Sequence, residues 1–337
     1  MDRIPHSRPT VGRDEAEAAS RAVLSGILAG GPEAMAFERE LAEAVGRRHA
    51  VLVSSGHQAL ELWLETLGLA PGAAVRIPSY ACAALLNAVE RCGLKPQIED
   101  VENLTLGLAP GPGTAIGANM LSIPCAAAAP SGETVLEDCA MGFVPGHTPR
   151  KGRDVLLSFY ATKMLTTGQG AALLTDSDDR ASRWRDRLTY DNRDKHLKVT
   201  NRSMTAIQAA MGRVQLGRYG AFLERRKALL AHYEGHLKAQ GWSLHPAVRQ
   251  ASDGVLFRLP LLVAEGAVDS LISKLGERGI EAKRPVWRPL HRFLGLADKD
   301  YPVSVRLHNT VLSLPFYPSL TDADVARIVE ALGAPSA

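Results

Sequence analysis

The sequence predicts an α/β protein with a large domain built on a mostly parallel central sheet and a smaller C-terminal α+β domain. Short apolar runs rich in β-forming residues alternate with helical stretches between residues 49 and 175, which is typical of a parallel sheet. From Met204 the apolar spacing becomes helical, and a smaller unit follows after about residue 240. The 337 residues, 46% of them hydrophobic, are enough for two domains, which we place at 1–238 and 239–337.

The first half of the chain is predicted to begin with two helices and to continue with the strands of the sheet. Residues 13–25 have the spacing of an amphipathic helix, and a second helix over 33–46 follows the turn at Gly30-Gly31-Pro32. The Gly- and Pro-rich stretch 104–114 is predicted to be a loop. The predicted strands are His49–Val53, Ala74–Ile77, Gln97–Val101, Met120–Ile123, Thr134–Glu137, Val155–Phe159 and Ala171–Thr175, with helices at His57–Leu67 and Ala81–Arg91.

The C-terminal third is predicted to contain one long connecting helix and a small mixed unit. Apolar residues recur at helical spacing from residue 207 to about residue 237. A strand near Val255–Leu262 and a helix around Val268–Leu275 follow. The last helix begins at Thr321, which opens a Thr-x-x-Asp capping box.

The charge balance argues against a nucleic-acid-binding protein. The net charge is +3, from 39 basic and 36 acidic residues, without the concentrated basic stripe that nucleic acid requires. No stretch approaches the about 20 apolar residues that span a bilayer, and the N-terminus has no apolar signal core. None of the four cysteines lies in a CxxC pair, so no metal site is indicated and we expect reduced thiols in the cytoplasm.

Lys163 is the first candidate for chemistry, at the end of the segment Ser158-Phe-Tyr-Ala-Thr-Lys163. Partial burial and neighbouring positive charge lower the pKa of a lysine at such a strand end, and a neutral amine can attack a carbonyl. Ser158 is placed to donate to a phosphate. Taken alone, this motif fits a surface lysine after a strand equally well.

Asp138 is the second candidate, at the C-terminal end of a predicted strand, where α/β sheets bind ligands. A pyridoxal phosphate (PLP) enzyme needs a carboxylate there to keep the pyridine nitrogen protonated. An Asp that caps the next helix is at least as good an interpretation. Ser55, Gly56 and His57 open a predicted helix whose amides suit a phosphate, with an ordinary Ser N-cap as the alternative. The order and spacing of the three motifs together favour PLP.

The sequence resembles the DegT/StrS-type sugar aminotransferases, a branch of the fold-type I PLP-dependent transferases. The resemblance runs from about residue 4 to residue 333. The matching motifs are Leu24-Ser-Gly26, Gly30-Gly-Pro32, Ser55-Gly56, Ile77-Pro-Ser-Tyr80, Glu137-Asp138-Cys-Ala140, Ser158 to Lys163, Asn201, Gln208-Ala-Ala210, Pro289-Leu-His291 and Leu312 to Thr321.

The resemblance implies a role for each site residue. Lys163 is the Schiff-base lysine and proton shuttle, and Asp138 pairs with the pyridine nitrogen. The phosphate site and the two sides of the cofactor ring are formed by Ser55, Gly56, His57, Ser158, Cys82, Ala140 and Met141. Asn201 of one subunit reaches the phosphate of the neighbouring subunit, which implies a homodimer with shared active sites. Substrate contacts are expected from Tyr190, His196 and His291, although Tyr190 and His196 also fit a solvated loop and His291 a structural histidine.

Several positions depart from the family pattern, three of them at the expected cofactor site. His57 stands where Thr is common, Met141 where Gln or His lies near the cofactor's phenolic oxygen, and Cys82 where many members have a stacking aromatic residue. The expected reaction moves an amino group, from glutamate, to a nucleotide-linked keto-sugar. The alternatives are a PLP-dependent lyase or dehydratase that uses the same lysine, and a PLP-binding protein with weak or no catalysis, which Met141 and Cys82 motivate.

Overall fold

The computed structural model describes residues 3–125, 134–147, 149, 153–191, 193–194 and 196–335. Its large sheet has seven strands in the order β1-β7-β6-β5-β4-β2-β3, and β7 is antiparallel to both of its neighbours while the other pairs are parallel. The mostly parallel sheet predicted from the sequence is therefore confirmed. The strands are β1 His49–Val53, β2 Ala74–Pro78, β3 Lys95–Glu99, β4 Ala115–Ala118, β5 Val135–Asp138, β6 Asp154–Ser158 and β7 Ala171–Thr175.

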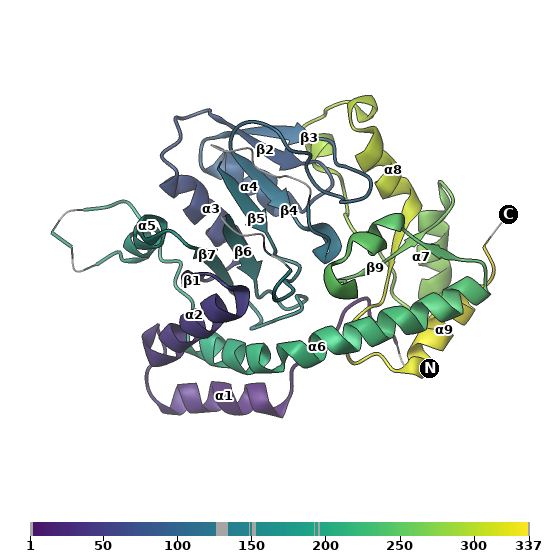
Figure 1. Ribbon diagram of the computed structural model, residues 1–337, viewed down its shortest axis with the longest axis horizontal. Helices are drawn as coiled ribbons and strands as arrows, with labels where there is room; N and C mark the ends of the chain where they lie inside the picture. The colour runs from purple at the N-terminus through teal and green to yellow at the C-terminus, as the bar shows by residue number, and fades with distance from the viewer. Residues whose placement is uncertain are drawn as a thin grey trace.

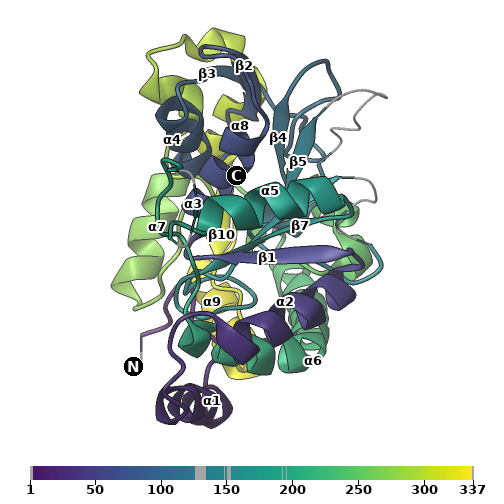
Figure 2. The same cartoon turned by 90° about the vertical axis from the view of Figure 1, so that its left-hand side faces the viewer.

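Helices cover both faces of this sheet because its strands carry apolar residues on both sides. Along β1, Val51 and Val53 belong to one core cluster, and Ala50 and Leu52 belong to another on the opposite face. Figure 2 shows α5 and α2 on opposite sides of β1 and β7. The first face packs on α3 Gly56–Thr66, α4 Ala83–Arg91 and α5 Asp178–Leu188, and the second on α2 Gly31–Val45 and α6 Ala206–Ala239, with α1 Arg13–Leu24 against α6.

The long helix α6 leads from the large sheet to a three-stranded antiparallel sheet (Figure 1). The strand order there is β10-β9-β8. This second unit contains β8 Ser243–Leu244, β9 Leu259–Leu262, β10 Val311–Leu314, α7 Ala267–Glu277, α8 Pro302–Thr310 and α9 Asp322–Leu332. The predicted capping box opens α9, since Thr321 Oγ1 accepts from the Asp324 N–H at 3.1 Å and the Thr321 N–H donates to the Asp324 carboxylate at 2.9 Å. Among the described residues, no helix combines the length and the apolar character needed to cross a membrane.

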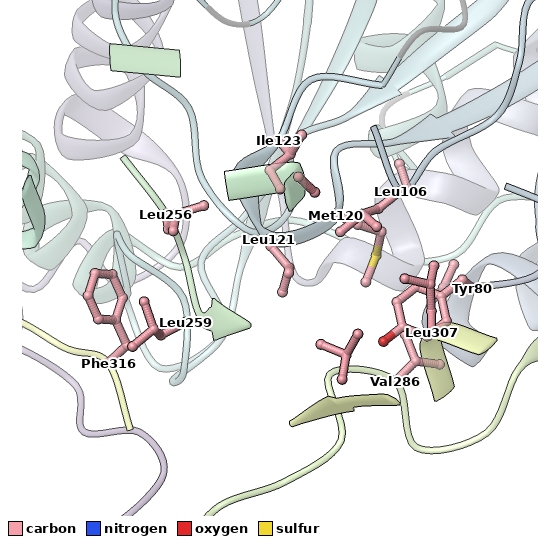
Figure 3. Close-up of a cluster of buried hydrophobic side chains, with 14 of the residues drawn as sticks. Tyr80, Leu106, Met120, Leu121, Ile123, Leu256, Leu259, Val286, Leu307 and Phe316 are labelled. Atoms are coloured by element: carbon pink, nitrogen blue, oxygen red, sulfur yellow. The ribbon is translucent and has the colours of Figure 1, made fainter. Parts of the chain in front are cut away.

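A single apolar cluster joins the two sheets. Figure 3 shows Tyr80 from the first half of the chain near Val286 and Leu307 from the last third, and all three belong to this cluster. Because buried side chains are close-packed, each unit stabilises the other at this contact. The division at residue 239 stays a prediction. In the described residues the 3-10 turns are η1 Met120–Ser122, η2 Pro246–Gln250, η3 Ser252–Gly254, η4 Leu290–Phe293 and η5 Asp298–Asp300.

Three strand predictions were wrong in position. The predicted strand Met120–Ile123 is a 3-10 turn, because Leu121 and Ser122 adopt left-handed backbone conformations with φ of 59° and 68°. The strand in that place of the sheet is the preceding β4, whose Ala-Ile-Gly-Ala sequence has few β-forming residues. The predicted strand Gln97–Val101 lies two residues earlier, as β3, and the predicted Val255–Leu262 contracts to β9.

Candidate active site

The expected site residues gather at one edge of the large sheet. β5 ends at Asp138 and β6 ends at Ser158, while Ser55 and Cys82 follow the ends of β1 and β2. These four strands run in the same direction, so their carboxyl ends meet at this edge. Ligands of open α/β sheets bind at this edge of the sheet.

Lys163 lies in the tight loop between β6 and β7. The loop is closed by the Phe159 N–H, which donates to the Gly170 carbonyl at 2.8 Å. The Lys163 amine lies 5.5 Å from the centre of the Phe257 ring and has no hydrogen-bond partner in the described part of the chain. Burial lowers the pKa of Lys163, and the nearby Asp138 carboxylate opposes this shift. The neutral, nucleophilic form of the amine is therefore more accessible than in a surface lysine.

Asp138 is a buried carboxylate with only one of its oxygens engaged. The Ala140 N–H donates to Oδ1 at 2.9 Å, and Oδ2 accepts no hydrogen bond from any residue that the structure describes. Burial raises the pKa of Asp138, while the Ala140 hydrogen bond and the charge of Lys163 act against this rise. A cationic N–H donor at Oδ2 would offset the burial and keep the carboxylate ionised.

The N-terminus of α3 offers unpaired amides beside Ser158. Ser55 is the N-cap, and its Oγ accepts from the Gln58 N–H at 3.3 Å. The N–H groups of Gly56 and His57 donate to none of the described residues, as expected at a helix start, where such amides bind anions. A Cβ atom added at Gly56 would lie 3.4 Å from Ser158 Oγ, so glycine leaves this space open. The His57 imidazole is turned along the helix toward Glu61, with Nε2 3.5 Å from Oε1, and its backbone is the part at the helix start.

The two departures beside the expected ring position have different surroundings. Cys82 is exposed at the N-cap of α4 and makes no capping hydrogen bond. Met141 is half-buried, and its sulfur accepts the Leu121 N–H at 3.0 Å. Met141 therefore holds the left-handed turn at Leu121 in place but offers no N–H donor to a phenolic oxygen.

These residues fit PLP. A half-buried amine without a hydrogen-bond partner, a buried carboxylate with a free oxygen and two free amides at a helix start match the aldehyde, the pyridine nitrogen and the phosphate of the cofactor. The described residues contain no group of three or more His, Cys, Asp or Glu that could hold a metal ion.

Comparison with known proteins identifies the family. The sequence model of the DegT/DnrJ/EryC1/StrS aminotransferase family matches residues 9–112 and 118–333. The chain belongs to this family. It is 28% identical over 373 residues to the spore coat polysaccharide biosynthesis protein SpsC of Bacillus subtilis (strain 168), covering 98% of this chain and 96% of SpsC. It is 29% identical over 328 residues to the GDP-perosamine synthase of Caulobacter vibrioides, with 88% of each chain covered.

The solved structures agree with this family assignment in their fold. The PLP form of Spr1654 from Streptococcus pneumoniae superimposes with a TM-score of 0.87 at 21% identity, over 98% of each chain. The protein is a PLP-dependent aminotransferase of fold-type I architecture, as the sequence motifs predicted.

The remaining expected residues of the aminotransferase lie in two environments: Asn201, Tyr190 and His196 are exposed, and His291 is buried. Asn201 is exposed, and its side-chain oxygen accepts from the Ser203 N–H at 3.3 Å. The adjacent Arg202 carbonyl accepts from the Ser54 N–H at 2.6 Å, so this segment runs beside the start of α3 in its own chain. Tyr190 and His196 are exposed on the segment after α5.

His291 is buried, and both of its ring nitrogens are engaged. Nδ1 lies 2.5 Å from Ser79 Oγ, and Nε2 lies 2.9 Å from the Asp298 carboxylate. The ring also stacks on Tyr301, with the ring centres 4.3 Å apart. These contacts favour the structural interpretation of His291 over direct contact with a substrate.

Sequence reasoning missed Phe257 and Arg258, which lie beside Lys163. The Arg258 guanidinium carbon is 4.2 Å from the centre of the Phe257 ring, the same ring that the Lys163 amine approaches. The signal in the sequence was a single charge inside the apolar run Val255–Leu262, because a buried charge is uncommon without a ligand or a partner.

Proposed function

We propose that this protein transfers an amino group from glutamate to a keto-sugar linked to a nucleotide. The observation that carries the proposal is the Lys163 amine, whose pKa burial lowers, acting together with the buried Asp138 carboxylate at the sheet edge of a PLP-dependent aminotransferase. The family resemblance supports glutamate as donor, and a relative at 29% identity is named for a GDP-linked sugar product.

The chain's own residues divide the work of such a transfer. When bound, PLP accepts the electron pair that is left when a proton leaves the donor's Cα. Lys163 would hold the cofactor covalently and would act as the neutral base that moves the donor's Cα proton. Asp138 would keep the pyridine nitrogen protonated. Ser158 and the amides of Gly56 and His57 would hold the phosphate.

We further propose a homodimer in which Asn201 contributes to the partner's phosphate site. Large apolar side chains that are well exposed in the single chain support an interface: Trp287 is 87%, Leu24 83% and Met35 70% exposed. We also propose a cytoplasmic location, on the reduced thiols expected from the sequence, where none of the four cysteines lies in a CxxC pair.

Steady-state kinetics test the proposed reaction. With glutamate and a panel of keto-sugar nucleotides as acceptors, double-reciprocal plots are expected to be parallel, because the amino group is stored on the enzyme between two half-reactions. Product is read as a mass change of the sugar nucleotide. Release of a keto product without consumption of glutamate would instead support the lyase or dehydratase reaction, and no turnover with any acceptor would contradict the proposal.

A further inference from the structure

His57 places an imidazole in the first turn of α3, where a basic side chain is unexpected. The helix dipole and the unpaired amides make a helix start favourable for anions and unfavourable for cations. The ring lies along the helix, with Nε2 3.5 Å from Glu61 Oε1. Nε2 is buried, yet it has no hydrogen-bond partner in the described part of the chain. Buried polar atoms are nearly always hydrogen-bonded, which indicates that this ring completes its contacts with a ligand.

Glu61 is a buried carboxylate, 4% exposed, that residues of two helices hold in place. Arg91 of α4 donates through Nε to Oε1 at 2.5 Å, and Gln58 of α3 donates through Nε2 to Oε2 at 3.1 Å. The Glu61 carbonyl also accepts from the thiol of Cys92, with 3.7 Å between sulfur and oxygen. Because these contacts fix the carboxylate, it is able to set the orientation of the imidazole beside it.

The second ring nitrogen, Nδ1, lies on the backbone side of the imidazole, because it is bonded to the ring carbon that carries Cβ. Nδ1 makes no hydrogen bond with any residue that the structure describes. The backbone of the same residue, with that of Gly56, supplies the two free amides at the helix start. A Cβ atom added at Gly56 would lie 3.4 Å from Ser158 Oγ, so the serine expected to bind the phosphate borders this turn. Nδ1 is therefore the nitrogen of His57 nearer to the phosphate site.

We propose that Glu61 is a positioning residue that acts on the cofactor's phosphate through the His57 imidazole. An imidazole between two anions binds both when each ring nitrogen carries a proton. Nε2 then donates to the Glu61 carboxylate and Nδ1 to the phosphate, in place of the threonine hydroxyl that is common at this position. The two negative charges offset the cost of a cation at a helix start. This role concerns the cofactor site alone, so it goes beyond the proposed reaction and holds for any amino acceptor.

Binding of PLP and of pyridoxal, which has the same ring and aldehyde but no phosphate, tests this role without turnover. Each is titrated by absorbance into the full-length protein after removal of the cofactor. His57→Ala is expected to bind PLP at least about tenfold more weakly than wild type, the loss of one charge-assisted hydrogen bond, with pyridoxal affinity unchanged. Glu61→Gln is expected to weaken PLP binding at least about threefold, again without an effect on pyridoxal. Glu90→Gln makes the same charge change at an exposed position of α4 and is the matched control, expected to bind both compounds like wild type.

The His57→Thr variant separates this positioning role from a purely structural one. Its hydroxyl is a new donor to the phosphate, so PLP affinity is expected to recover relative to His57→Ala. In the His57→Thr background Glu61→Gln is expected to leave PLP affinity unchanged, because the ring through which Glu61 acts is gone. An equal effect of Glu61→Gln in both backgrounds, or equal losses of PLP and pyridoxal, would overturn the inference. The His57 side chain is 33% exposed, so His57→Ala decides the question if Glu61→Gln does not fold, and wild-type PLP affinity in His57→Ala would also overturn it.

Discussion

Asp138→Asn separates the catalytic role of this carboxylate from its effect on stability. The amide keeps an oxygen for the Ala140 N–H, which Oδ1 accepts at 2.9 Å, but it presents a neutral NH₂ group where Oδ2 was. A charge pair at about 4 Å in an effective dielectric constant of about 20 is worth about 4 kcal/mol. Loss of that interaction in the transition state corresponds to a rate about 1000-fold lower.

The assay is the rate at which the PLP-loaded variant converts glutamate to 2-oxoglutarate, compared with wild type and with Asp14→Asn. Asp14 is exposed on α1, so this control makes the same charge change far from the site. An Asp138→Asn enzyme that binds PLP and keeps a rate within about tenfold of wild type would refute the role assigned to the carboxylate.

The same substitution is expected to stabilise the cofactor-free protein. Burial raises the pKa of Asp138 in the folded state, so ionisation of this group disfavours folding. Its contribution to stability is present below the pKa of the unfolded chain and is lost as the pH rises through the raised folded pKa. Urea unfolding at acidic and neutral pH is expected to show Asp138→Asn gaining stability relative to wild type as the pH rises. An equal difference at both pH values would contradict this reasoning.

Three further predictions concern Lys163 and the core. Borohydride treatment of the PLP-loaded enzyme is expected to leave the cofactor on a peptide containing Lys163, and Lys163→Ala is expected to give no such peptide and to lose at least about 100-fold in rate; an adduct on another lysine would overturn the assignment. Because burial lowers the pKa of Lys163, the rate is expected to rise with pH through a midpoint below the ordinary lysine value of 10.5, and a limb that rises only at that value would contradict it. Trp63→Phe removes the hydrogen bond that the buried indole donates to Asp154 at 2.8 Å. The free energy of unfolding in urea is expected to fall by about 1–3 kcal/mol, and an unchanged value would contradict a contribution from this bond.

Local sequence was sufficient to predict the half of the site that follows strand ends. The run Val155-Leu-Leu157 before Ser158 is continuous and apolar, as expected for a strand buried on both faces, and the shorter apolar pair Val135-Leu136 precedes Glu137 and Asp138. The N-cap at Ser55 could be predicted because its hydrogen bond spans only three residues. Where the structure depends on such short-range contacts, the predicted strand ends and helix starts lie within one or two residues of the observed ones.

The other half depends on contacts that a sequence does not display. The strand β4 was missed because its small residues give a weak signal, while the apolar residues after it lie in a turn with left-handed Leu121. Phe257 lies near Lys163, and its N–H donates to the Leu121 carbonyl, a contact across more than a hundred residues. The burial of His291 could not be predicted for the same reason, because its hydrogen-bond partner Ser79 lies 212 residues away in the sequence.

A single-turnover experiment tests the central claim most directly. PLP-loaded enzyme is mixed with glutamate in the absence of any acceptor, and the 2-oxoglutarate released is compared with the number of active sites. An aminotransferase in which Lys163 and Asp138 move the donor's proton is expected to release one equivalent per site and then stop until a keto-sugar nucleotide is added. No release of 2-oxoglutarate, or continuous release without an acceptor, would contradict the account.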